Sequence, residues 1–379
     1  MSRLLLSPTQ LQKLLRSNTK TVVLDSTWFM PNSPRVAKAE FKAKRIPGSQ
    51  FLDLDEVASS HPLGLKHMLP SPQMFANACG AFGIERSSTA VFYDAHGVFS
   101  SPRALWMFKQ AFGHENAAIL DGGLPRWEAE GFPVDSSPEI VAPVPTAYST
   151  PMLNALVTRS YEQMVDNAAK KLPAGELVMD ARSRGRFLGT DPEPRPGLSS
   201  GHMPHSVSLP FNLFLRNHVA PNGSPYTTFL PEDQLRSALK EAIGSERLSQ
   251  AVLQGQQPVI TSCGSGMTAA ILWLGLQLLG VKNTSLYDEA RILFVFLSRC
   301  SRRAIVLDWL RSSAIKYNRE IWLSGIQLWS RNATGFTWYL ARAARTAAVV
   351  MGAYLLPYAL LRQGSDTVNE DKEVVRRPL

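Results

Sequence analysis

Cys263 is the residue of this sequence whose setting best suits a nucleophile. It ends the apolar run PVITSC and precedes the loop GSGMTA, which leads into the apolar stretch AAILWLGLQLL. Gly264 and Gly266 let backbone amides converge on one point, and these amides together with the dipole of the following helix attract negative charge. Because the thiolate is the reactive form of cysteine, we predict a nucleophilic thiolate at Cys263.

The other two cysteines give no comparable signal. Cys79 lies in FANACGAF, an apolar pattern typical of a core helix, and Cys300 lies in the basic segment that follows residue 290. Three cysteines are too few for a disulfide framework and indicate a reducing compartment. The net charge of +9 does not indicate nucleic-acid binding, because residues 289–379 hold 14 Lys/Arg and 7 Asp/Glu and therefore most of the excess. We expect no nucleic-acid partner.

The elements around Cys263 are repeated in the first half of the chain. TVVLDSTWF at Asp25 matches ELVMDARSRGRF at Asp180, and TAVFYD, which ends at Asp94, matches PVITSC. Short apolar strands that alternate with helical segments predict a parallel sheet flanked by helices, with ligands beyond the carboxyl ends of the strands. Asp94 stands where the second half has Cys263, so we expect the first half to support the structure and the substrate site without a nucleophile of its own.

The repeat sets the domain organisation, since 379 residues exceed one ordinary core. We predict an α/β protein with tandem domains at residues 1–136 and 154–290. Residues 137–153 form a linker rich in Pro, Ser and Thr, and residues 291–379 form a separate basic and apolar tail. An irregular insertion near 215–232 is expected to be a loop of the second domain.

Several separated motifs resemble the 3-mercaptopyruvate sulfurtransferases, which are built from tandem rhodanese-like domains. They are CGSGMTA, MDARSRGRFLGTDPEPRPGLSSGHMP, IPGSQFLDLD, HMLP and SPRALWMF, and they span about residues 5–288. The resemblance implies that sulfur passes from 3-mercaptopyruvate to Cys263 as a persulfide and then to cyanide, a thiol, or a protein acceptor such as thioredoxin. It also implies release of pyruvate without a metal or organic cofactor.

The same resemblance implies how the substrate is bound. Arg186 in GRF and Arg195 in EPR match the family's substrate-binding arginines, whose forked and permanently charged groups suit a carboxylate and a ketone. The alternative is a salt bridge with Asp191 or Glu193. Further substrate contacts are expected from Gly264, Gly266, Met267 and Thr268.

Ser265 matches a loop serine that the family is proposed to couple to a histidine and an aspartate. Those roles fall here on His67, in HMLP, and Asp55, in DLD. The spacing between them is one residue longer than the family's usual pattern, so Asp53 is the alternative. Such a relay would polarise the ketone and protonate the pyruvate enolate, although a histidine near a proline is more often an ordinary loop residue.

Two other cysteine enzymes share parts of the pattern. A thiosulfate sulfurtransferase has basic residues directly after its cysteine for a dianionic substrate, whereas Gly264, Ser265 and Gly266 carry no charge. A Cys-loop phosphatase needs an arginine six residues after the cysteine, and that position is Ala269. Mercaptopyruvate is therefore favoured, thiosulfate is the alternative, and the phosphatase would need an arginine from elsewhere.

After Asp288 the sequence leaves the family pattern. Glycine, serine and tryptophan normally follow this aspartate and pack beside the catalytic loop, but here EARILFVF follows. An inactive, membrane-associated interaction protein is therefore the alternative function. The uncharged stretch 346–361 is shorter than the roughly 20 residues of a spanning helix. This stretch fits a marginal tail anchor or a buried helix. We favour a third interpretation, in which it is translated sequence that does not belong to the functional product, such as a mispredicted exon or a fusion.

The N-terminus shows no secretory signal. Arg3, Lys13, Arg16 and Lys20 occur in the first twenty residues without an acidic residue, which is compatible with mitochondrial import and equally with a basic first helix. We predict a cytoplasmic or mitochondrial location, or both.

Overall fold

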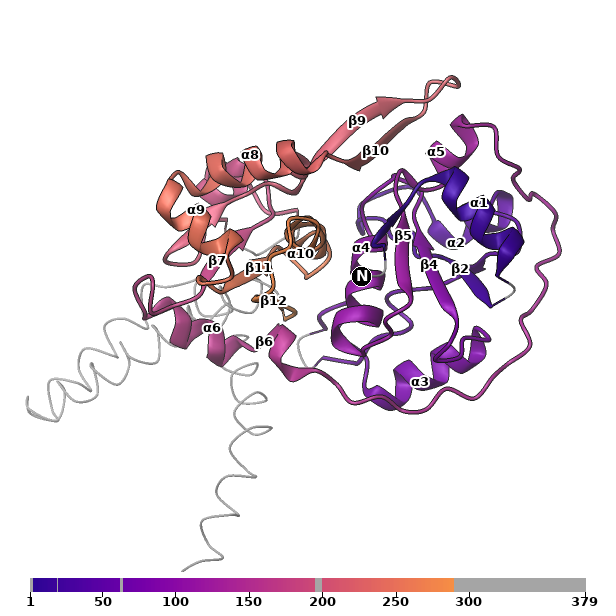
Figure 1. Cartoon of the computed structure of the whole chain (residues 1–379), viewed down its shortest axis with the longest axis horizontal. Coiled ribbons are helices and arrows are strands. Elements are labelled where there is room, and N and C mark those ends of the chain that lie inside the picture. The colour runs from indigo at the N-terminus through magenta and orange to yellow at the C-terminus, as the bar shows by residue number, and fades with distance from the viewer. Residues whose placement is uncertain (1–2, 19, 62–63, 195–199, 290–379) are drawn as a thin grey trace, which may run out of the picture. The chain divides into compact units, whose positions relative to one another are not determined.

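Two five-stranded parallel sheets form the framework of the computed structural model, which describes residues 3–18, 20–61, 64–194 and 200–289 (Figure 1). In spatial order the first sheet is β1 (Leu5–Leu6), β5 (Ala117–Leu120), β4 (Thr89–Tyr93), β2 (Thr21–Asp25) and β3 (Gln50–Phe51). The second is β6 (Thr158–Arg159), β12 (Thr284–Tyr287), β11 (Val259–Ser262), β7 (Leu177–Asp180) and β8 (Ser206–Ser208). The two sheets have equivalent strand orders, which confirms the predicted repeat and α/β class.

Helices connect the strands in both halves. The first half contains α1 (Pro8–Ser17), α2 (Ala37–Ala43), α3 (Pro72–Ala81), α4 (Ser101–Leu105), the π-helical turn η1 (Trp106–Ala111) and α5 (Gly123–Ala129). The second contains η2 (Ala155–Val157), α6 (Tyr161–Ala168), α7 (Arg184–Leu188), η3 (Phe211–Phe214), α8 (Glu232–Ile243), α9 (Glu246–Leu253) and α10 (Ala269–Leu278). Ser7 and Ser160 begin α1 and α6 with complete capping boxes, which explains where these helices start.

The central strand β11 and the helix α10 place Cys263 between them. All four residues of β11 are buried, as expected for a strand covered on both faces. α10 is buried along most of its length, and Gly275 leaves room for the ring of Phe214. The catalytic loop between the two elements, residues 263–268, is therefore fixed at both ends by the core.

The predicted insertion near 215–232 is an antiparallel hairpin, so the expectation of an irregular loop was wrong. β9 (Leu215–Val219) pairs with β10 (Pro225–Phe229), and Gly223 adopts a positive φ of 81° in the turn. The hairpin contacts the first half, because the amide of Phe229 donates to Asp121 Oδ1 at 2.9 Å. A short Gly-containing turn between two strand-forming runs was the signal for it.

Among the described residues, no helix combines the length and the apolar character needed to cross a membrane. The stretch 346–361 and the rest of the predicted tail lie outside the described residues.

Candidate active site

Cys263 lies directly after β11, with only 2% of its surface exposed. The amide of Ser265 points at its Sγ atom at 3.4 Å, so one of the expected backbone donors already faces the sulfur. Gly266 adopts a φ of +80°, a conformation that strains other residues, which explains the glycine in the loop. The loop is thus shaped to hold negative charge on a sulfur atom at this point.

A cavity of about 270 Å³ lies beside Cys263 and takes its walls from both halves of the chain. Trp28, Met30 and Phe99 come from the first half. The second half supplies Ala181, Arg182, Ser183, Arg186, Glu193, Pro194, Phe211, Gly264, Ser265, Met267 and Thr268. A lining that combines aromatic side chains with two guanidinium groups suits a small organic acid, because the apolar groups exclude water and strengthen the polar contacts.

A larger cavity of about 870 Å³ lies at the carboxyl ends of the first sheet, near Asp25 and His96, and its lining contains no cysteine. The residue there that corresponds to Cys263 is Asp94. Its Oδ2 atom accepts hydrogen bonds from the amides of Phe99, Ser100 and Ser101 at 2.9 to 3.0 Å. Because this carboxylate occupies its own loop amides, the first half cannot present them to a substrate anion. We therefore assign the chemistry to the smaller cavity.

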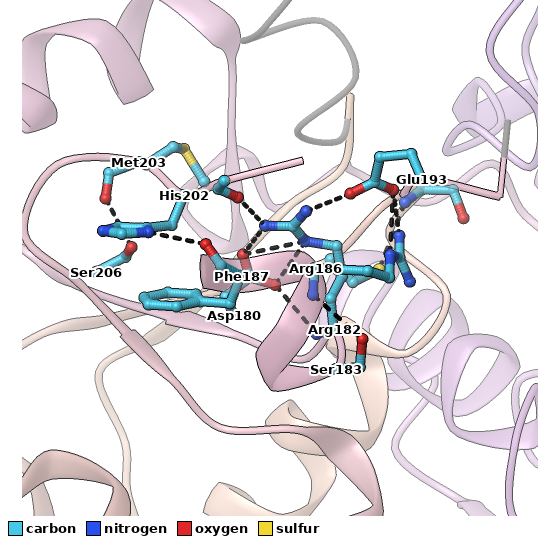
Figure 2. A network of polar contacts seen from close by, with 12 residues as sticks. Asp180, Arg182, Ser183, Arg186, Phe187, Glu193, His202, Met203 and Ser206 are labelled. Atoms are coloured by element: carbon cyan, nitrogen blue, oxygen red, sulfur yellow. Dashed lines mark hydrogen bonds and ion pairs between the residues drawn. The ribbon is translucent and has the colours of Figure 1, made fainter. Parts of the chain in front are cut away.

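A buried network of charges contributes Arg182, Arg186 and Glu193 to the cavity lining (Figure 2). Asp180, at the end of β7, accepts hydrogen bonds from Arg182 through both carboxylate oxygens. Glu193 lies between two guanidinium groups, with 2.5 Å from Oε1 to Arg182 Nη1 and 2.5 Å from Oε2 to Arg186 Nη2. Burial acts to raise the pKa of Glu193, but the two arginines outweigh it and lower that pKa.

Arg186 has contacts that bear on both roles considered from the sequence. It forms the predicted alternative salt bridge with Glu193, and it also lines the cavity, with Nη2 3.2 Å from where a side chain at Gly264 would begin. Arg195 lies outside the described residues. Arg182 was not predicted. The sequence could have indicated Arg182, because it stands two residues after Asp180, which ends the buried strand β7. This position brings both side chains to the same edge of the sheet.

His67 and Asp55 are brought together in the first half. Nδ1 of His67 lies 3.0 Å from Asp55 Oδ1, and Trp28 Nε1 donates to Asp55 Oδ2 at 3.1 Å. Burial acts to raise the pKa of Asp55, but the hydrogen bonds from His67 and Trp28 outweigh it and lower the pKa. The alternative, Asp53, instead accepts the amides of Asp55 and Glu56 within its own turn.

Ser265 lines the cavity, whereas the lining as far as the structure describes the chain includes neither His67 nor Asp55. Trp28 connects the His67–Asp55 pair with the cavity. Its ring packs against that of His67, with centroids 5.1 Å apart, and Trp28 also lines the cavity. Within the described ranges, no cluster of His, Cys, Asp and Glu side chains is arranged to hold a metal ion.

A repeated parallel sheet, with a cysteine and an amide-rich loop after the central strand of one copy, defines a tandem rhodanese-like protein. The Rhodanese-like domain family matches residues 7–130. A probable 3-mercaptopyruvate sulfurtransferase of Schizosaccharomyces pombe is 37% identical over 74% of this chain and 88% of its own length. The thiosulfate/3-mercaptopyruvate sulfurtransferase 1, mitochondrial, of Arabidopsis thaliana is 35% identical over 70% of this chain and 69% of its own.

Solved structures agree with this assignment. The Tum1 protein of Saccharomyces cerevisiae superimposes with a TM-score of 0.66 at 30% identity, over 78% of this chain and 95% of its own. The chain therefore belongs to the 3-mercaptopyruvate sulfurtransferase family of rhodanese-like enzymes.

Proposed function

We propose that this protein transfers sulfur from 3-mercaptopyruvate through a persulfide on Cys263. The observation that supports this most directly is the position of the Cys263 sulfur, which faces the Ser265 amide beside a small cavity lined by Arg186. The forked guanidinium group of Arg186 suits the substrate carboxylate, and the cavity brings the substrate sulfur to the thiolate. Arg195 is proposed to add a second guanidinium group.

The reaction has two half-reactions. The Cys263 thiolate attacks the substrate sulfur, and the carbon–sulfur bond breaks with its electron pair passing to carbon, which gives the enolate of pyruvate. A proton is then delivered to that carbon, and pyruvate leaves. In the second half, an acceptor thiolate or cyanide attacks the outer sulfur of the persulfide and returns Cys263 to its thiolate.

The proton delivery is assigned to Ser265 and His67. Asp55 orients the His67 ring through Nδ1, as the aspartate of a Ser-His-Asp relay does. Ser265 lines the cavity, and we assign to its hydroxyl group the polarisation of the ketone and the connection with His67. The amides around Gly264 and Gly266 stabilise the negative persulfide, and Met267 and Thr268 complete the substrate contacts.

Charge favours mercaptopyruvate over thiosulfate as donor. The loop residues from Gly264 to Thr268 are uncharged, and the guanidinium groups of Arg182 and Arg186 are each paired with a carboxylate. A monoanion needs less compensating charge than a dianion in such a site. Thiosulfate remains the second candidate, because the Arabidopsis relative is named for both donors.

Mass spectrometry of the intact protein tests the persulfide. After incubation with mercaptopyruvate and no acceptor, the wild type is expected to gain the mass of one sulfur atom, and Cys263→Ser to gain none. Cys79→Ser is the matched control, since burial in the core raises the pKa of the Cys79 thiol and keeps it unreactive. Equal sulfur on the wild type and Cys263→Ser would refute the proposal.

The acceptor and the compartment are further parts of the proposal. A thiol such as that of thioredoxin, or a protein sulfur carrier, can take the outer sulfur, since the chemistry requires only an attacking thiolate. The mitochondrial name of the Arabidopsis relative and the basic N-terminal segment favour mitochondria, and the cytoplasm is the alternative. The inactive, membrane-associated alternative predicts no pyruvate release from the full-length chain.

A further inference from the structure

We propose that Arg103 and Asp288 form a positioning pair that holds His67 of the first half against the Gly266 end of the catalytic loop. This inference rests on the proposed function, in which His67 takes part in proton delivery. Arg103 lies in α4 of the first half, and Asp288 directly follows β12 of the second. The pair therefore connects the two halves beside the active site.

The pair holds the backbone that directly follows the His67 side chain, at the His67 carbonyl group and the Leu69 amide. Nη2 of Arg103 lies 2.6 Å from Asp288 Oδ1 and donates to the His67 carbonyl oxygen at 2.7 Å. The other carboxylate oxygen of Asp288 accepts the amide of Leu69 at 2.9 Å. His67 has a φ of 46°, which is unfavourable for a residue other than glycine and persists only where its surroundings enforce it. These two hydrogen bonds provide that enforcement.

The same pair touches the catalytic loop. A side chain at Gly266 would begin 3.1 Å from Arg103 Nη1 and 3.4 Å from the Asp288 carbonyl oxygen, so the loop backbone passes directly over the pair. The guanidinium group of Arg103 thus contacts both the loop backbone at Gly266 and the His67 carbonyl group, and it sets their positions relative to one another. The distance between the nucleophile loop and the proton-delivering ring is fixed by this one side chain.

Burial makes the arrangement rigid. The side chains of Arg103 and Asp288 are 2% and 9% exposed, and the guanidinium carbon of Arg103 lies 4.6 Å from the Trp106 ring centroid. Arg103 was absent from the sequence-based site, although it stands in the motif SPRALWMF. Asp288 is the last residue before the sequence leaves the family pattern, and it still makes both contacts.

A second aspartate provides a matched control. Asp121, at the end of β5, pairs with Arg126 at 3.1 Å and accepts the Phe229 amide from the second half, much as Asp288 accepts that of Leu69. Asp121→Asn and Arg126→Lys therefore weaken an equivalent contact between the halves without touching His67 or the catalytic loop.

The test compares two sulfur donors in Asp288→Asn and Arg103→Lys. When mercaptopyruvate gives up its sulfur, pyruvate leaves as an enolate whose carbon must be protonated. When inorganic polysulfide gives up a sulfur atom, the leaving group is a shorter sulfur anion that needs no proton on carbon. We expect kcat for pyruvate release to fall at least about tenfold with little change in KM, and we expect the same of His67→Gln. Single-turnover formation of the Cys263 persulfide from polysulfide should stay within about twofold of the wild type. Both control variants should keep both reactions.

Three other outcomes would overturn the inference. If both donors lose the same factor, the pair supports the loop or the fold and not proton delivery. If neither donor is affected, the pair has no role in the reaction. If the wild type itself releases no pyruvate, the proposed function fails, and this inference fails with it. If Asp288→Asn does not fold, the same comparison of the two donors can be made with Arg103→Lys, which retains the charge.

Discussion

Arg182 and Asp180 form a bidentate ion pair at the end of β7, with both side chains 1% exposed. Removing one partner of such a pair leaves an unpaired charge in the interior. We expect Arg182→Met to lower the free energy of unfolding by about 3–5 kcal/mol. Arg236→Met, which breaks an exposed pair with Glu232, should cost less than about 1 kcal/mol. Denaturant unfolding of both variants measures the difference, and similar losses would contradict the structural role assigned to Arg182.

Arg186 is expected to bind the substrate carboxylate by two parallel hydrogen bonds. Lysine keeps the charge at this position but loses the fork, so Arg186→Lys should raise KM for mercaptopyruvate by about tenfold and affect kcat less. Steady-state kinetics of pyruvate release provide the measurement. An unchanged KM would show that the ion pair with Glu193 is the only role of Arg186.

The donor preference depends on the uncharged loop after Cys263. Ser265→Lys should slow pyruvate release and raise the ratio of thiosulfate to mercaptopyruvate activity by at least about tenfold, because an added cation compensates the second charge of thiosulfate. Ser265→Ala is the control for the lost hydroxyl group and should slow pyruvate release without any gain with thiosulfate. The idea that charge sets the preference fails if the two variants behave alike.

Asp25 gives a prediction about pH and stability. Burial raises its pKa from the ordinary value of 3.8 to about 7, against hydrogen bonds from Thr27 that lower it. A raised pKa in the folded state means that this group's contribution to stability is complete below about pH 4 and is lost as the pH rises through about 7. Asp25→Asn keeps the acceptor oxygen without the charge. It should therefore be more stable relative to the wild type at about pH 8.5 than at about pH 5.

Melting temperatures of the wild type and Asp25→Asn at these two pH values decide the point. A constant difference between the two proteins at both pH values would show that Asp25 is not protonated in the fold near neutral pH.

The sequence predicted the repeat and the place of Cys263, because both depend on local patterns. A buried strand of a parallel sheet appears in the sequence as an apolar run. A cysteine that directly follows such a run lies at the carboxyl edge of the sheet, and this does not depend on distant parts of the chain. The hairpin at 215–229 was missed because many residues of its strands are exposed, which leaves a weak hydrophobic pattern.

The pairing of charges could not be predicted in the same way. The sequence favoured Asp55 as the partner of His67 and left Asp53 as the alternative. The structure separates them, because Asp53 accepts the amides of its own turn whereas Asp55 lies against His67. Arg103 and Asp288 are 185 positions apart, and contact between them depends on how the two halves pack. Such contacts follow from tertiary structure, for which one sequence carries no local signal.

The most direct test of the account is pyruvate release from 3-mercaptopyruvate by the purified full-length wild type and by Cys263→Ser, with cyanide as acceptor and Cys79→Ser as control. We predict steady release by the wild type and by Cys79→Ser, and none above the uncatalysed rate by Cys263→Ser. Equal release by the wild type and Cys263→Ser, or no release by the wild type, would contradict it.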